Sequence, residues 1–61
     1  MCELKVIIEN EVKFENAIYA KSIENKVTVS DIFGKSREFK NCQIIEVDIS
    51  KEQLTLSPIK L

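Results

Sequence analysis

The sequence predicts a small all-β barrel, and three observations lead to this fold class. Apolar and polar residues alternate in short runs, as they do in strands that bury one face. Turn-forming residues, chiefly asparagine, separate these runs every several residues. No segment keeps the 3.6-residue period of a helix. With a length of 61 residues, the chain is a single domain over 1–61 that is thinly stabilised by its own core.

The first predicted strand occupies the N-terminus. One of its faces takes alternate apolar residues, namely Cys2, Leu4, Val6 and Ile8. Ile7 breaks this pattern. Residues 9–11 then predict a polar turn into a second strand, where Asn16 marks a bend or bulge before the extended stretch 17–23.

The middle of the chain predicts a hairpin and a short additional strand. Glu24 and Asn25 form a two-residue turn, because asparagine tolerates a positive φ, and residues 26–32 alternate as a strand. Gly34 opens a polar link to the short strand 36–39. Phe39 is expected to point inward from that strand.

The last hairpin begins after a turn at Asn41. Residues 42–50 carry Ile44, Ile45, Val47 and Ile49 with Glu46 and Asp48 between them, residues 50–52 turn, and residues 53–56 return. Pro58 ends the final strand. Five or six short antiparallel strands of this length fit a small SH3-like barrel, whose closure hides the sheet edges.

Composition narrows the classes of function. Nine basic against ten acidic residues give a net charge of −1, so no overall field draws the chain to nucleic acid or anionic lipid. No apolar run is long enough for a membrane span, and two cysteines without a sign of export indicate a cytoplasmic protein with reduced thiols. The chain has no histidine, no glycine-rich phosphate loop and no nucleophile beside a base, so we expect no enzyme.

Cys2 is the candidate metal ligand. A cysteine here is more often a small apolar residue than a ligand, but its position allows unusual chemistry. If methionine is removed, the free α-amine and the thiol of Cys2 close a five-membered chelate ring around one metal. If methionine stays, the deprotonated amide takes the place of the amine.

A twofold homodimer completes this ligand set, because identical residues near the axis face each other. Two nitrogens and two thiolates suit square-planar Ni(II) or Cu(II), and nickel is the sharper expectation. The outward residues Ile7, Ile23 and Ile32 are candidates for the subunit interface.

The start Met1-Cys2-x-x-Lys5-Val6 on a short all-β chain resembles the CooT family of small nickel-binding proteins. The stretches Ile45-Glu46-Val47-Asp48 and Gln53-Leu54-Thr55-Leu56 extend this resemblance over nearly the whole length. The resemblance implies an SH3-like homodimer that binds one Ni(II) through Cys2 of each subunit. It also implies a metallochaperone-like link to the maturation of carbon monoxide dehydrogenase.

Two other interpretations stay open. The family has also been labelled RNA-binding, and here Lys35, Arg37 and Lys40 around Gly34 are the best nucleic-acid candidate, although a solvated loop explains them as well. Phe33 and Phe39 nearby are expected to be needed in the core. Cys42 is interpreted as a buried structural thiol, with a disulfide to Cys2 as the minority alternative. Four acidic residues are spaced for solubilising strand surfaces: Glu3, Glu9, Glu46 and Asp48.

Overall fold

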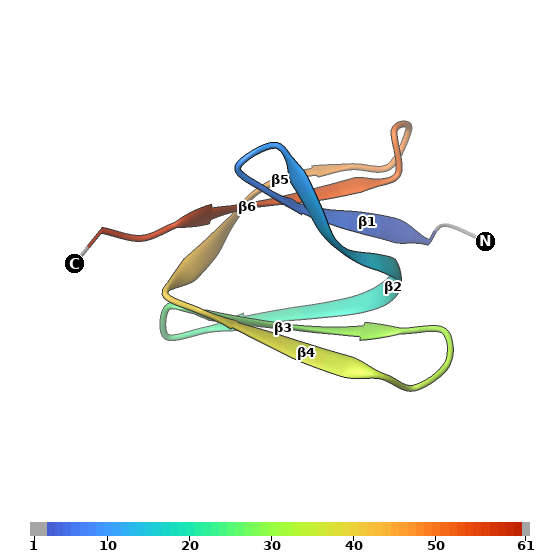
Figure 1. Ribbon diagram of the computed structural model, residues 1–61, viewed down its shortest axis with the longest axis horizontal. Coiled ribbons are helices and arrows are strands. Elements are labelled where there is room, and N and C mark those ends of the chain that lie inside the picture. The colour runs from blue at the N-terminus through green and yellow to red at the C-terminus, as the bar shows by residue number, and fades with distance from the viewer. Residues whose placement is uncertain (1–2, 61) are drawn as a thin grey trace.

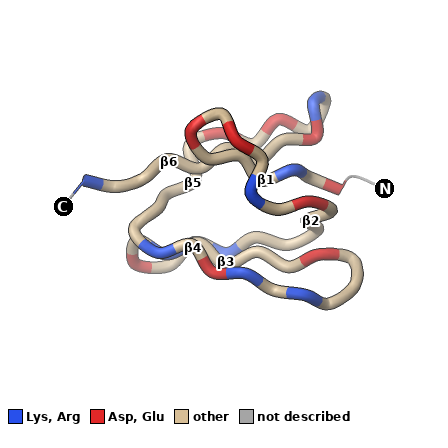
Figure 2. The backbone as a smooth tube through the Cα atoms, in the orientation of Figure 1, with Lys and Arg blue, Asp and Glu red and all other residues tan. Residues whose placement is uncertain are grey.

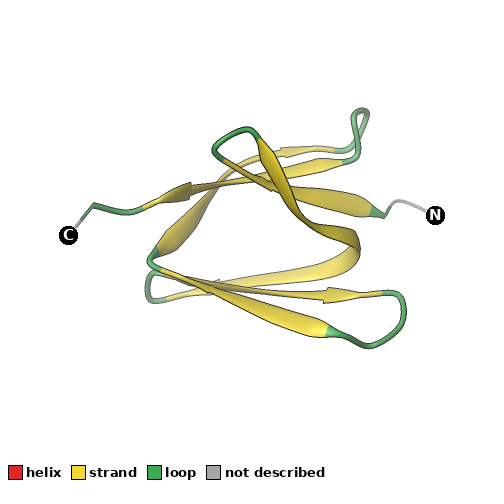
Figure 3. Cartoon of the chain, in the orientation of Figure 1, coloured by secondary structure: helices red, strands yellow, loops and turns green. Residues whose placement is uncertain are grey.

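Each alternating run of the sequence becomes a strand in the computed structural model, which describes residues 3–60 (Figure 1; Figure 3). The strands are β1 (Leu4–Ile8), β2 (Glu11–Ile23), β3 (Lys26–Asp31), β4 (Ser36–Lys40), β5 (Cys42–Asp48) and β6 (Gln53–Pro58). The all-β prediction is confirmed. Residues 3–60 contain no helix, and therefore none that is long and apolar enough to cross a bilayer.

The thirteen-residue strand β2 organises the sheet, whose order is β4-β3-β2-β1-β6-β5. Asn16 has a φ of 62°, and the pairing register shifts on both sides of β2 near this residue. The predicted bend is thus confirmed at Asn16. Because of the bend, the first half of β2 pairs with β1 and the second half pairs with β3, so that two layers fold over each other (Figure 1).

The pairing of β1 with β6 is parallel, with Lys5 opposite Gln53 and Ile8 opposite Leu56. The prediction of antiparallel strands throughout is wrong for this pair, and the prediction of short strands is wrong for β2. Alternation shows which face of a strand is buried but says nothing about the direction of its neighbour. The chain ends thereby become central strands of the sheet.

The core lies between the two layers. One layer contributes Val6, Ile8, Leu54 and Leu56, and the other contributes Val27, Val29 and Phe39. Ala17 is buried at the bend, directly after Asn16, and pairs with Leu4 and Asp31. The inward position predicted for Phe39 is confirmed. Cys42 completes the core as a buried free thiol, as predicted, with 7% of its surface exposed.

The sheet remains open among the described residues, because β4 and β5 are its two edges and do not pair with each other. A full barrel closure is therefore not formed. The single residue between them, Asn41, has a φ of 56° and turns the chain away from β4 so that β5 joins β6. The N–H of Cys42 donates to the carbonyl of Asn25, which holds the start of β5 near the β2–β3 turn (3.2 Å).

Large apolar side chains remain on the surface as well as in the core. The most exposed are Val12, Ile18, Tyr19, Ile23, Ile32, Phe33, Ile45, Val47 and Ile49. The outward positions predicted for Ile23 and Ile32 are confirmed, whereas Ile7 is half-buried. The core role expected for Phe33 is wrong: the residue lies in a loop after β3, and 75% of its surface is exposed.

Candidate metal centre

The predicted ligand Cys2 lies outside the described residues. It is bonded to Glu3, the first residue that the structure describes, which directly precedes β1. The part of the structure nearest to Cys2 in sequence is therefore the end of the sheet at which β1 begins. We call this region the N-terminal end, and define it by Glu3, the β3–β4 loop (residues 32–35) and the β5–β6 loop (residues 49–52).

Strand register brings these three segments to the same end of the molecule (Figure 1). Leu4 pairs with Ala17, which in turn pairs with Asp31, the last residue before the β3–β4 loop. On the other side of β1, the N–H of Lys5 donates to the carbonyl of Glu52 in the β5–β6 loop (2.9 Å). Both loops thus flank the start of β1.

An aspartate organises each of these loops. The Asp31 carboxylate accepts hydrogen bonds from the N–H groups of Phe33 (2.9 Å) and Lys35 (2.8 Å). The Asp48 carboxylate accepts bonds from the Ser50 hydroxyl (2.7 Å) and the Lys51 N–H (3.1 Å). These donors, the Ser50 hydroxyl first, hold the pKa of Asp48 below its ordinary value, because they stabilise the charged form.

Sequence reasoning assigned Asp48 to a solubilising strand surface and missed this capping role. The signal was present in both segments, since an aspartate at the end of a strand and directly before a turn is typical of such caps. Each aspartate is followed by an isoleucine, Ile32 or Ile49, whose side chain is exposed. The two loops therefore present apolar side chains at the N-terminal end.

A polar groove of about 240 Å³ also lies at this end, between the start of β1 and the bend of β2. It is lined by three carboxylates, two ammonium groups and one amide, namely Glu3, Glu15, Glu52, Lys5, Lys51 and Asn16. The three carboxylates and two ammonium groups leave a net charge of −1 around it. Among residues 3–60, no three Cys, Asp or Glu side chains gather closely enough to hold a metal ion.

The second cysteine is far from this end. Cys42 pairs with Pro58 at one end of β6, whereas Lys5 of β1 pairs with Gln53 at the other end. At about 3.3 Å per residue, the five residue steps from Gln53 to Pro58 span roughly 16 Å. Cys42 is also buried and free. These positions separate Cys42 from the start of β1, in keeping with its predicted structural role.

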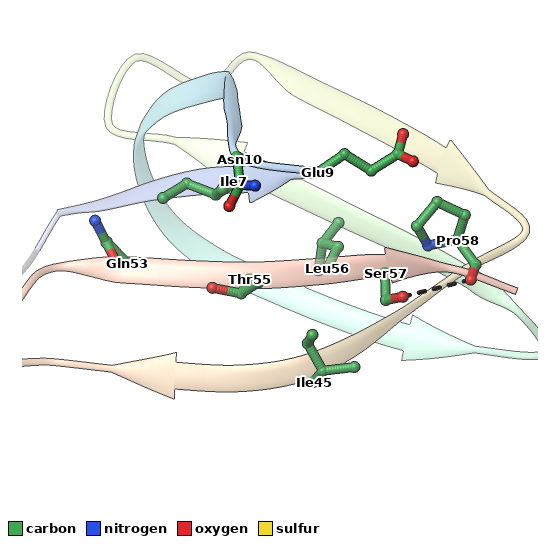
Figure 4. Close-up of a pocket in the computed structure, with 9 residues that line it drawn as sticks. All are labelled: Ile7, Glu9, Asn10, Ile45, Gln53, Thr55, Leu56, Ser57 and Pro58. Carbon is green, nitrogen blue, oxygen red and sulfur yellow. Dashed lines mark hydrogen bonds between the residues drawn. The ribbon is translucent and has the colours of Figure 1, made fainter.

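A larger groove crosses β1, β6 and β5 (Figure 4). Its volume is about 480 Å³, and Ile7 and Ile45 lie on opposite sides of Thr55 within it. Glu9 supplies its one carboxylate. This groove lies beside the β1–β2 turn and Pro58, so its size does not indicate the metal site.

The three cations of the RNA-binding alternative lie along β4 and the loop before it, at one edge of the sheet. Lys35 lies in the loop before β4, Arg37 lies within that strand, and Lys40 ends it. The Arg37 guanidinium lies 4.7 Å from the centre of the Phe39 ring and donates to the carbonyl of Lys13 (2.8 Å). The Arg37 guanidinium and the Phe39 ring are thus engaged within the fold, whereas Phe33, the other aromatic ring near these cations, is exposed.

Comparison with known proteins decides the family. A family model described as CO dehydrogenase accessory protein CooT matches residues 1–57. The chain belongs to the CooT family. The match spans the two predicted hairpins, both loops of the N-terminal end and the Met1-Cys2 start on which the resemblance rested. None of the curated proteins matches the chain significantly. The CooT description names an accessory role for CO dehydrogenase and no catalytic step of its own.

Proposed function

We propose that the protein is a cytoplasmic, metallochaperone-like accessory protein that binds one Ni(II) per homodimer through Cys2 of each subunit, in support of CO dehydrogenase maturation. The observation that carries the proposal is the CooT family match, which includes the N-terminus. The position of Cys42 adds support, because this buried thiol belongs to the core at the other end of β6. Cys2 is then the thiol for the metal.

The chemistry of Cys2 suits this cargo. Each subunit supplies one thiolate and one nitrogen, which is the α-amine after methionine removal or the deprotonated amide if methionine stays. Two subunits thus offer two sulfurs and two nitrogens, a donor set that favours square-planar Ni(II). Neither subunit holds the complete set alone, so the site requires the dimer.

The surface supports self-association. Nine large apolar side chains are exposed among the described residues, which is a large share for a chain of 61 residues. A fold of this size gains stability when it buries such residues against a second subunit. The free thiol of Cys42 is in keeping with a reducing compartment, and so with the cytoplasm.

The test compares Cys2→Ser with Cys42→Ala in a nickel titration that is followed by thiolate-to-metal absorption and by metal content. We expect the Cys2 variant to lose nickel while keeping its fold and its dimer, because the change lies before the first strand. The Cys42 variant should keep one nickel per two chains. Unchanged nickel binding by Cys2→Ser refutes Cys2 as the nickel ligand. A protein that stays monomeric when fully loaded with nickel refutes a site shared between two subunits.

The pH dependence gives a second readout from the same preparation. Cysteine thiols titrate near ~8.5 and α-amines near ~8, so Ni(II) competes with protons at neutral pH. Nickel affinity should therefore rise with pH, and binding should release protons into a weakly buffered solution. An affinity that is flat between pH 6.5 and 8.5 contradicts thiolate ligation.

A further inference from the structure

The outer face of β2, β3 and β4, which we call the basic face, points away from the core. Val27 and Val29 of β3 are buried, so the residues that alternate with them, and their partners across the ladder, point outward. The charged residues on this face are Lys21, Lys26, Glu38 and Lys40. Three cations and one carboxylate give it a net charge of +2 (Figure 2). A groove of about 360 Å³ crosses the face beside the exposed side chains of Tyr19 and Ile23.

The outer face of β1, β6 and β5, which we call the acidic face, belongs to the other layer. Val6 and Leu54 are buried, so the residues that alternate with them on β1 and β6 point outward, as do their partners on β5. The charged residues here are Lys5, Glu46 and Asp48, together with Glu9, which lines the groove of Figure 4. One cation and three carboxylates give a net charge of −2. Ile7 and Ile45 supply apolar surface in the same groove.

Each face holds two charged side chains that form no ion pair within residues 3–60. The ion pairs of this part of the chain join Glu11 to Lys13 and Lys26 to Glu38. On the basic face this leaves two unpaired lysines, Lys21 and Lys40. On the acidic face it leaves two unpaired glutamates, Glu9 and Glu46. These four side chains are available to a partner of opposite charge.

The unpaired lysines and the unpaired glutamates have the same spacing. Lys21 on β2 and Lys40 on β4 are separated by two strands across the sheet and by two residues along it. Glu46 on β5 lies two strands from Ile7 on β1, and Glu9 follows Ile7 by two residues. At about 4.8 Å per strand and 3.3 Å per residue, both separations are about 12 Å. Both lysines can therefore lie opposite both glutamates in a single contact.

We propose that the basic face of one copy of this chain docks on the acidic face of a second copy, with the unpaired lysines opposite the unpaired glutamates. The apolar side chains beside these charges, Tyr19 and Ile23 on one face and Ile7 and Ile45 on the other, are buried in the same contact. Like faces repel each other, so each face selects the other kind. The inference goes beyond the proposed function, because this contact needs no metal.

The contact is head-to-tail. The two faces belong to the two layers that enclose the core and point away from each other, so two chains cannot make both contacts with each other. Each added copy leaves one face of each kind open, and assembly continues beyond two chains as a ring or an open array. The N-terminal end belongs to neither face. The twofold dimer proposed for nickel can therefore be linked into larger assemblies through this second contact.

The test measures the mass of the metal-free protein by light scattering as its concentration rises from micromolar to millimolar. At 20 mM salt the mass should rise above two chains, and at 500 mM salt it should fall, because salt screens the charges. Lys21→Glu and Glu46→Lys should each weaken association about tenfold or more, since each places like charges opposite each other. An equimolar mixture of the two variants should associate within about threefold of the wild type, because each altered face then meets its opposite charge.

Two matched variants control for net charge. Lys51→Glu and Glu52→Lys make the same changes of charge in the β5–β6 loop, outside both faces, and should associate as the wild type does. Circular dichroism checks the fold of every variant, and the salt dependence of the wild type tests the proposal without any substitution. A wild-type mass that stops at two chains or does not respond to salt overturns the proposal. Wild-type association by either single variant, or a mixture that does not recover, overturns it as well.

Discussion

The two ends of the sheet differ in the residues that form their turns. We interpret this difference as a division between turns that stabilise the fold and loops that contact partners. The end opposite the N-terminal end closes with minimal turns, Glu9–Asn10 and Glu24–Asn25, in which both residues of each pair have a positive φ. Such turns match the twist of a hairpin and expose little apolar surface. The loops of the N-terminal end are longer, and each uses an aspartate cap to hold isoleucine or phenylalanine in water.

The loops of the N-terminal end contain more hydrogen bonds than are needed to connect their strands. A two-residue turn would join β3 to β4 with less exposed apolar surface. The chain instead keeps Ile32, Phe33 and Ile49 exposed beside the start of β1. We interpret the opposite end as structural and the N-terminal end as functional. The following changes test that division, from the largest expected effect to the smallest.

Leu54→Ala removes a core side chain that is almost completely buried. The cavity should cost about 2–5 kcal/mol of unfolding free energy, which is most of the stability of so small a domain. Thermal unfolding followed by circular dichroism should show a partly unfolded variant, and nickel binding should fall with it. Val12→Ala at the exposed surface is the control, with a change within ~0.5 kcal/mol. A stable Leu54→Ala variant contradicts the assigned core.

Asn25→Ala tests the structural end. Asn25 has a φ of 61°, a conformation that costs alanine about 1–2 kcal/mol, so the melting temperature should fall by several degrees. Asn25→Gly is the matched variant and should match or exceed the wild type, because glycine adopts this φ without strain. Both variants should bind nickel and CO dehydrogenase normally. A change in either binding at constant fold shows that this end is functional too.

Carboxyl titration gives the smallest effect and compares the ends directly. Lys13 holds the pKa of Glu11 below its ordinary value, through a hydrogen bond of 2.7 Å and through its charge. The pKa of Asp48 is also lowered, but mainly by two uncharged donors, the Ser50 hydroxyl and the Lys51 N–H. A carboxyl with a lowered pKa stabilises the fold above its unfolded pKa. That contribution is lost as pH falls through the lowered pKa, below about pH 4 here.

Salt distinguishes the two carboxyls. Screening weakens the charge pair of Glu11 with Lys13, so high salt should move the pKa of Glu11 toward its ordinary value. The pKa of Asp48 should change less, because its main donors are uncharged. Carbon-detected NMR titrations at 20 mM and 500 mM salt measure both groups in one sample. Equal salt shifts at the two positions contradict a neutral cap in the β5–β6 loop.

Local sequence determined the strands and the tight turns, because alternation, asparagine and glycine act within a few residues of each other. Phe39 and Cys42 were placed in the core correctly, and the bend was placed at Asn16. The start of the chain and the stretches 45–48 and 53–56 also suggested the CooT family, which the match over residues 1–57 confirms. The assignment of Cys2 as the nickel ligand rests on this sequence reasoning and stays a prediction.

Only the tertiary structure decided the parallel pairing of β1 with β6 and the open edge between β4 and β5. Strand direction and barrel closure depend on contacts between segments far apart in the chain. The alternation of apolar and polar residues carries no information about these contacts. The same holds for Phe33: its aromatic character predicts burial, but Asp31 and Asn16 hold its loop outside the core. Exposure is a property of the folded surroundings, so sequence alone identified the side chain and the fold determined its place.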